Sequence, residues 1–122
     1  MINQLIIEGN VRNPEYRELP GGKKILSFEL AHERSYTSTH GPMKETCLFE
    51  VEMYGNAAEA LKGCLWENRG VRLVGRLKQV RWEGYGETSS RTFVVAEHID
   101  LKPVGKHDSA DLFPEMQRGG KR

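Results

Sequence analysis

The sequence has few cysteines, no long apolar segment and no signal peptide. Only two cysteines, Cys47 and Cys64, occur among its 122 residues, and they lack the spacing of a Cys-x-x-Cys pair. We expect both to be reduced structural thiols. The longest apolar run spans residues 93–96 and is far too short to cross a membrane. The opening residues also lack the basic start and apolar core of a leader, which predicts a soluble, cytoplasmic protein.

Excess charge of one sign is missing as well. Lysine and arginine number 18 and aspartate and glutamate number 17, so the formal net charge is +1. This balance excludes a histone-like polycation. Any anion-binding surface must therefore arise from the placement of cations on one face of the molecule.

Motifs of catalysis, phosphate binding and metal binding are absent. The sequence contains no P-loop, no Gly-x-Ser-x-Gly and no His-Glu-x-x-His. Glu50 and Glu52 share one face of a predicted strand, a spacing that is ordinary for a solvated strand and no sign of acid–base chemistry. The histidines have no zinc-site spacing with the cysteines: His32, His40, His98 and His107. We expect no cofactor, no metal and no enzymatic activity.

Alternating apolar residues predict five strands, near residues 5–11, 26–30, 45–54, 71–82 and 91–101. In the third strand, the expected inward residues are Cys47, Phe49, Val51 and Met53, whereas Leu48 and Tyr54 are expected to face outward.

The connections are predicted from turn residues and from one change of period. Residues 20–24 predict a turn, and residues 35–44 predict a long polar loop. After Tyr54 the pattern becomes helical, with Asn56 as the expected N-cap, Glu59 three residues later and an end near residues 68–70.

Three strands, a helix and two more strands predict a five-stranded OB-fold barrel, an all-β architecture with its helix between the third and fourth strands. An SH3-like barrel would lack this helix. Gly9 and Gly75 are expected where strands bend sharply to close the sheet. We assign residues 1–102 to this domain and expect residues 103–122 to form a flexible tail because the tail has little periodicity.

The fourth strand loses its apolar register halfway. Val71, Leu73, Gly75 and Leu77 share the inward face, but the next two inward positions are Gln79 and Arg81. We infer that the barrel ends near Leu77 and that the strand continues into a projecting hairpin.

That hairpin combines aromatic and cationic side chains: Trp82, Tyr85, Arg76, Lys78, Arg81 and Arg91. Aromatic rings stack on bases and cations contact phosphates, so this composition suits single-stranded nucleic acid. The alternative interpretation is that Trp82 covers a barrel end and that the charges keep an edge hairpin soluble.

Other exposed apolar groups favour the binding interpretation. Leu48 and Tyr54 point outward, and Tyr36 stands between Arg34 and Lys44; these groups are expected on one side of the barrel. Trp66, by contrast, is expected to cover the core. The expected phosphate-contacting residues are Arg34, Lys44, Arg72, Arg76, Lys78, Arg81 and Arg91.

Several segments also resemble one family in order along the chain. The opening NQLIIEGNVRNPEYRELPGGKKILSFELA, then ETCLFEVEMYGNAAEAL, GVRLVGRLKQVRW and RTFVVAEHI are similar to bacterial single-stranded DNA-binding proteins (SSB). The resemblance covers residues 1–102. It implies an OB fold, a homotetramer, and binding of single-stranded DNA without strong sequence preference in replication, recombination and repair.

The resemblance also implies roles for individual residues. The family's base-stacking positions fall on Tyr36, Leu48, Tyr54 and Trp82. Leucine at position 48 replaces the usual tryptophan, which removes a π face and argues for weaker or differently distributed binding.

The tail departs from the family, whose acidic tip recruits replication and repair proteins. Here DSADLFPEM is an internal candidate for such a motif, with an idle solvated tail as the alternative, and the chain finishes RGGKR. A second hypothesis is favoured by three features: the missing acidic tip, the leucine at position 48 and the near-zero net charge of the folded part. In it, the chain is an assembly subunit like the primosomal PriB type and acts mainly through protein contacts.

Overall fold

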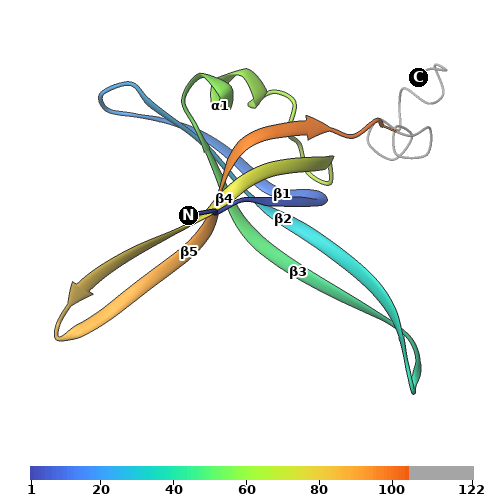
Figure 1. Ribbon diagram of the computed structural model, residues 1–122. Helices are drawn as coiled ribbons and strands as arrows, with labels where there is room; N and C mark the ends of the chain where they lie inside the picture. The colour runs from blue at the N-terminus through green and yellow to red at the C-terminus, as the bar shows by residue number, and fades with distance from the viewer. Residues whose placement is uncertain (105–122) are drawn as a thin grey trace, which may run out of the picture.

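Five strands close into a barrel whose neighbours are β1-β2-β3-β5-β4, with β4 returning to β1 (Figure 1). The computed structural model describes residues 1–104, so most of the predicted tail, DSADLFPEM included, lies outside the described residues. Within residues 1–104, the β3–β5 pair is parallel and the other strand pairs are antiparallel. The elements are β1 (Leu5–Leu19), β2 (Lys23–Ser38), β3 (Gly41–Tyr54), α1 (Gly55–Leu61), β4 (Gly70–Gly84) and β5 (Glu87–Leu101).

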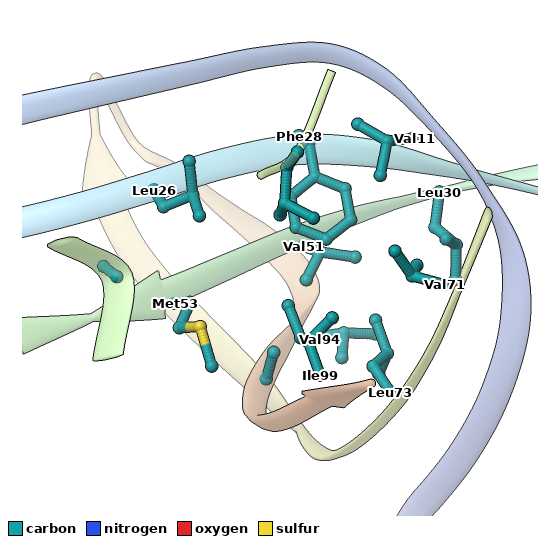
Figure 2. Close-up of a cluster of buried hydrophobic side chains, with 13 residues drawn as sticks. Val11, Leu26, Phe28, Leu30, Val51, Met53, Val71, Leu73, Val94 and Ile99 are labelled. Carbon is teal, nitrogen blue, oxygen red and sulfur yellow. The ribbon is translucent and has the colours of Figure 1, made fainter. Parts of the chain in front are cut away.

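This topology confirms the predicted OB fold. The core takes one face of each strand and Ala58 of α1, and Leu26, Leu30 and Leu73 are at most 1% exposed. None of the described helices is long and apolar enough to span a membrane. Figure 2 shows the central cluster, which includes Val11, Leu26, Phe28, Leu30, Val51, Met53, Val71, Leu73, Val94 and Ile99.

Two glycines lie where backbones pass closely. A Cβ atom at Gly9 would clash with the carbonyl oxygen of Ala31, and one at Gly75 would clash with the carbonyl oxygen of Val95. The pairing of β4 with β5 also shifts register between Val74 and Gly75. Both positions therefore need glycine for the barrel to close, in agreement with the prediction.

The long loop predicted over residues 35–44 is wrong, because this segment is a hairpin. β2 and β3 pair without interruption to the tight turn at Ser38 and Gly41. The Ser38 hydroxyl accepts a hydrogen bond from the His40 amide at 3.1 Å and donates one to the Gly41 carbonyl at 3.2 Å. Gly41 supplies the positive φ of 104° that closes the turn. The polar sequence reflects strands solvated on both sides, which a pattern of buried residues cannot reveal.

The helix is shorter than predicted and begins differently. α1 ends at Leu61, and its N-cap is Tyr54, without a side-chain capping bond. Asn56 and Glu59 instead contact Lys24 of β2, whose ammonium donates to the Asn56 side chain at 3.3 Å and pairs with the Glu59 carboxylate. The expected capping residues therefore fasten the helix to the barrel.

The β2–β3 and β4–β5 hairpins project from the barrel as arms (Figure 1). We call residues 33–46 the β2–β3 arm and residues 77–92 the β4–β5 arm. Gly75 is the last buried residue of β4, and Leu77 is 49% exposed. The barrel thus ends just before Leu77, as inferred. Phe49, expected to be inward, is 37% exposed, and Cys47 is half-buried, because β3 also runs beyond the barrel at this point.

Candidate nucleic-acid interface

The outward residues of three adjacent strands form one surface. On β3, the buried side chains of Val51 and Met53 turn Glu50, Glu52 and Tyr54 outward. β5 lies between β3 and β4 in the barrel, so outward residues of all three strands are neighbours. We call this surface the outer face: Leu48, Glu50, Glu52 and Tyr54 of β3, Arg91 and Phe93 of β5, and Arg76, Lys78, Val80 and Trp82 of β4.

Tyr54 contacts both a cation and a carboxylate on the outer face. The Lys78 ammonium reaches from β4 across β5 to lie 5.9 Å from the centroid of the Tyr54 ring. The Tyr54 hydroxyl donates a hydrogen bond of 2.6 Å to Glu52 Oε1. Desolvation and then this bond to Glu52 raise the pKa of Tyr54 to about 12, partly offset by the charges of Arg91 and Arg76. The structure thus brings a predicted stacking residue together with three predicted phosphate-contacting cations.

Arg91 is the most firmly held of those cations. Its Nε donates to Glu50 Oε1 at 2.8 Å and its Nη2 donates to Glu52 Oε2 at 3.2 Å. The guanidinium also lies 4.1 Å from the centroid of the Phe93 ring, which is only 4% exposed. Partial desolvation lowers the pKa of Arg91, but the two carboxylates outweigh it and raise this pKa above its ordinary value.

The β4–β5 arm presents two aromatic side chains to solvent. Trp82 is 51% exposed on the same face of β4 as Lys78. Tyr85 stands at the tip, fully exposed. Gly84 pairs with Glu87, and Tyr85 and Gly86 have positive φ values of 53° and 80°. These values are typical of the two-residue type I′ turn, whose twist matches that of the flanking strands.

On the β2–β3 hairpin, the register separates residues expected together. Tyr36 pairs with Met43 and Leu48 pairs with Ala31, with no shift between them. Successive side chains alternate across the sheet, so Tyr36 points to the opposite side of the hairpin from Leu48 and Tyr54. The expectation of one shared side is therefore wrong for Tyr36. It is 40% exposed and packs with Arg34, whose guanidinium lies 5.4 Å from the ring centroid.

Five of the seven cations expected to contact phosphates pair with carboxylates. Within residues 1–104, neither Lys78 nor Arg81 lies within ion-pair distance of a carboxylate. The four pairs besides that of Arg91 have solvated side chains and separations of 3.4 to 3.6 Å, so each contributes little and can exchange partners: Arg34–Glu45, Lys44–Glu33, Arg72–Asp100 and Arg76–Glu97.

Arg72 is set apart from the other cations. It lies before the Gly75 bend, opposite Glu8 of β1 and Asp100 of β5. Hydrogen bonds from His98 and then Arg72 hold the pKa of Asp100 below its ordinary value, against an opposing effect of desolvation. Arg72 therefore belongs to a charge network on the wall of the barrel rather than to either arm.

Sequence reasoning missed the carboxylates at the centre of this surface. It recognised that Glu50 and Glu52 share an outward face but not that Arg91 lies beside them. Their contact depends on the parallel pairing of β3 with β5, in which Val51 lies opposite Val94. Local spacing carries no signal for such a pairing. The only available hint was opposite charge on two predicted strands.

A closed five-stranded barrel with aromatic and cationic side chains along two solvated arms defines an OB-fold protein of the nucleic-acid-binding class. The model of the single-strand binding protein family matches residues 2–102. The chain therefore belongs to that family.

Individual relatives resemble this chain in sequence and in structure. The single-stranded DNA-binding protein of Aquifex aeolicus is 31% identical over 119 residues, which cover 96% of this chain and 80% of the relative. That of Helicobacter hepaticus is 32% identical over 86% of this chain and 65% of its own length. The wild-type Thermus aquaticus crystal structure matches with a TM-score of 0.74 at 30% identity, over 87% of this chain and 52% of that one. The chain thus spans about half of the Thermus protein.

A fourth similarity concerns the fold alone. The Plasmodium falciparum SSB in complex with single-stranded DNA matches with a TM-score of 0.70 at 21% identity, over 83% of this chain and 93% of that chain. The barrel is therefore shared with a protein solved on single-stranded DNA, at an identity too low to transfer individual contacts.

Proposed function

We propose that the chain binds single-stranded DNA without strong sequence preference. The observation that carries this proposal is the outer face, where the Lys78 ammonium lies 5.9 Å from the Tyr54 ring centroid and half-exposed Trp82 follows on the same face of β4. Rings stack on any base and cations contact any phosphate, so such a surface recognises a strand rather than a sequence. Membership of the single-strand binding protein family supports the same ligand.

The proposed roles differ between residues. Bases stack on Trp82 and Tyr54, with Tyr85 and Tyr36 adding contacts at the arms and Leu48 adding an apolar contact without a π face. Lys78 is the first phosphate ligand of the outer face, and Arg81 offers a second on the opposite face of the β4–β5 arm. Within residues 1–104, neither of these cations pairs with a carboxylate. Loosely paired cations exchange their carboxylates for phosphates: Arg34, Lys44 and Arg76. Arg72 and Arg91 are the least available of the predicted set.

The proposed biological role follows from this ligand. Single-stranded DNA arises in replication, recombination and repair, and the chain would coat and protect it there without catalysing a reaction. We propose that it acts in the cytoplasm, at the nucleoid. A homotetramer is the proposed assembly, and the 66% exposed Ile6 beside Val74 on the outside of the β1–β4 pair supports a subunit contact there.

A fluorescence titration with oligo-dT tests the proposal. Bases stacked on Trp82 should quench the tryptophan emission, and duplex DNA of equal length should quench it far less because its bases are already stacked. Saturable quenching by the single strand supports the proposal. Equal binding of duplex, or no binding of oligo-dT at low salt, contradicts it.

The pairing of five predicted cations favours a second candidate, an assembly subunit that acts mainly through protein contacts. Self-neutralised cations attract phosphates less strongly, which leaves protein contact as the larger share of the function. A partner protein that binds stably and competes with single-stranded DNA, together with weak intrinsic DNA affinity, would select this candidate. The predicted tail motif lies outside the described residues and would have to be tested by truncation.

A further inference from the structure

Two carboxylates occupy the middle of the outer face. Along β3, Glu50 and Glu52 stand between Leu48 and Tyr54, where a bound strand would have to pass between two proposed base-contacting residues. Glu50 is well exposed, with 55% of its side chain accessible, whereas Glu52 is only 15% accessible. A DNA backbone that crosses this region therefore approaches fixed negative charge.

The surroundings neutralise that charge only in part. A shallow hollow at this place is lined by three carboxylates, Glu29, Glu50 and Glu52, and by the guanidinium groups of Arg17 and Arg91. Glu29 lies directly opposite Glu50 in the β2–β3 register, so two like charges face each other there. A phosphate at the hollow meets more negative than positive charge and is repelled unless one carboxylate is removed or displaced.

The geometry also shows which cation these two carboxylates keep from contacting DNA phosphates. Arg91 is the single predicted phosphate ligand held by two carboxylates among the described residues, at 2.8 Å from Glu50 and 3.2 Å from Glu52. Charge-assisted bonds of this length are stronger than the solvated pairs at 3.4 Å and beyond. Arg91 can bind a phosphate only by giving up these bonds.

We propose that Glu50 acts as an internal competitor for DNA phosphates, holding Arg91 so that the outer face binds single-stranded DNA more weakly than its cations would allow. The inference rests on the proposed function and assigns an affinity-determining role to a residue of the same face. Glu50 is the residue to change because Glu52 also accepts the hydrogen bond from Tyr54, so its replacement would disturb a stacking ring.

A double-mutant cycle tests the competition. Glu50→Gln keeps the shape of the side chain and removes its charge. Oligo-dT affinity should rise about three- to fivefold, the range that one exposed charge pair allows. The slope of log affinity against log salt should steepen by about 0.7, because Arg91 adds one phosphate contact. Arg91→Gln alone should change affinity less than twofold in the native chain, and it should abolish the gain when combined with Glu50→Gln.

Glu8→Gln is the matched control. Glu8 is as exposed as Glu50, with 52% of its side chain accessible, and it pairs with Lys102 at 3.7 Å on β1, away from the outer face. It changes the net charge equally and should leave affinity and slope unchanged. An equal gain from Glu8→Gln would show a general charge effect and overturn the proposal, as would a gain from Glu50→Gln that persists without Arg91.

The cycle separates this inference from the function it rests on. If the native chain binds oligo-dT and Glu50→Gln has no effect, the competitor role is wrong and the binding function stands. If neither the native chain nor any variant binds oligo-dT at low salt, the binding function is wrong and the competitor role is rejected with it.

Discussion

At the level of single residues, the two tryptophans of the chain occupy contrasting environments. Trp82 is 51% exposed on a solvated arm. Trp66 is half-buried after α1, with the Arg69 guanidinium 5.1 Å from its ring centroid. A flat ring in solvent can accept a base, whereas a ring packed against its own chain cannot without local rearrangement. The two side chains therefore form a natural pair of test and control.

Replacing Trp82 should remove most of the fluorescence response to DNA. Trp82→Ala loses one stacking platform, which should weaken oligo-dT binding by roughly 1 to 3 kcal/mol. Trp66→Phe should leave both the affinity and most of the quenching in place. Titrations of the two variants under identical conditions measure both effects. Quenching that survives in Trp82→Ala and disappears in Trp66→Phe would locate the DNA elsewhere.

Tyr54 should make folding sensitive to strongly alkaline pH. Desolvation and Glu52 raise its pKa to about 12 from the ordinary value of 10.0. The folded state therefore holds the phenol proton more tightly than the unfolded state. This contribution to stability is complete below pH 10 and is lost as the pH rises from about 10 towards 12. Tyrosinate absorbance should show one late-titrating group fewer in Tyr54→Phe, and an unchanged titration curve would refute this environment.

At the level of elements, Gly75 lies where β4 leaves the barrel and continues into the arm. Gly75 lies against the Val95 carbonyl with no room for a Cβ atom, at the shift of register between β4 and β5. The same bend separates the buried half of β4 from the arm that carries Trp82. Fold and proposed site are therefore coupled at this one residue.

Gly75→Ala should destabilise the barrel by about 2 kcal/mol or more, because the backbones must separate to admit the methyl group. Gly63→Ala is the control: a Cβ atom there meets nothing within 4 Å, and Gly63 is not among the positive-φ residues. Urea unfolding of the two variants measures the difference. Equal stability of both variants would mean that the close approach at Gly75 is easily relieved.

How far the sequence determines these elements depends on whether each strand buries one face. Alternation predicted the number of strands and the end of the barrel near Leu77, and the change to a helical period predicted the place of the helix. Alternation failed for residues 35–44, because an arm solvated on both sides has the composition of a loop. Sequence pattern also did not predict the hydrogen bond from Arg91 to Glu50, since the parallel pairing of β3 with β5 brings together residues 41 positions apart.

At the level of the whole molecule, the net charge of +1 agrees with a surface on which most of the predicted phosphate-contacting cations pair with carboxylates. Attraction of DNA must come from a few local cations rather than from an overall field. On the barrel wall, exposed Ile6 lies beside half-buried Val74, next to the charged pair of Glu8 and Arg72. We therefore expect DNA on the outer face and the arms, and subunit contact at Ile6 and Val74.

Assembly should depend on Ile6 and its neighbour Val74. Ile6→Asp places a charge on a side chain that is 66% exposed in the single chain and should shift the native mass from tetramer to smaller species. Val80→Asp, at a 41% exposed position on the β4–β5 arm, should leave the mass unchanged in the absence of DNA. Light scattering of both variants decides between them. A monomeric native chain would contradict the proposed assembly.

The most direct measurement of the central claim is the affinity for oligo-dT across a series of salt concentrations, made on the native chain and on Lys78→Gln. Two unpaired cations, or five when the loosely paired ones join them, give a slope of log affinity against log salt between about −1.4 and −3.5. Lys78→Gln should make that slope shallower by about 0.7. A flat salt dependence, or a slope that Lys78→Gln does not change, would contradict binding of single-stranded DNA by the outer face.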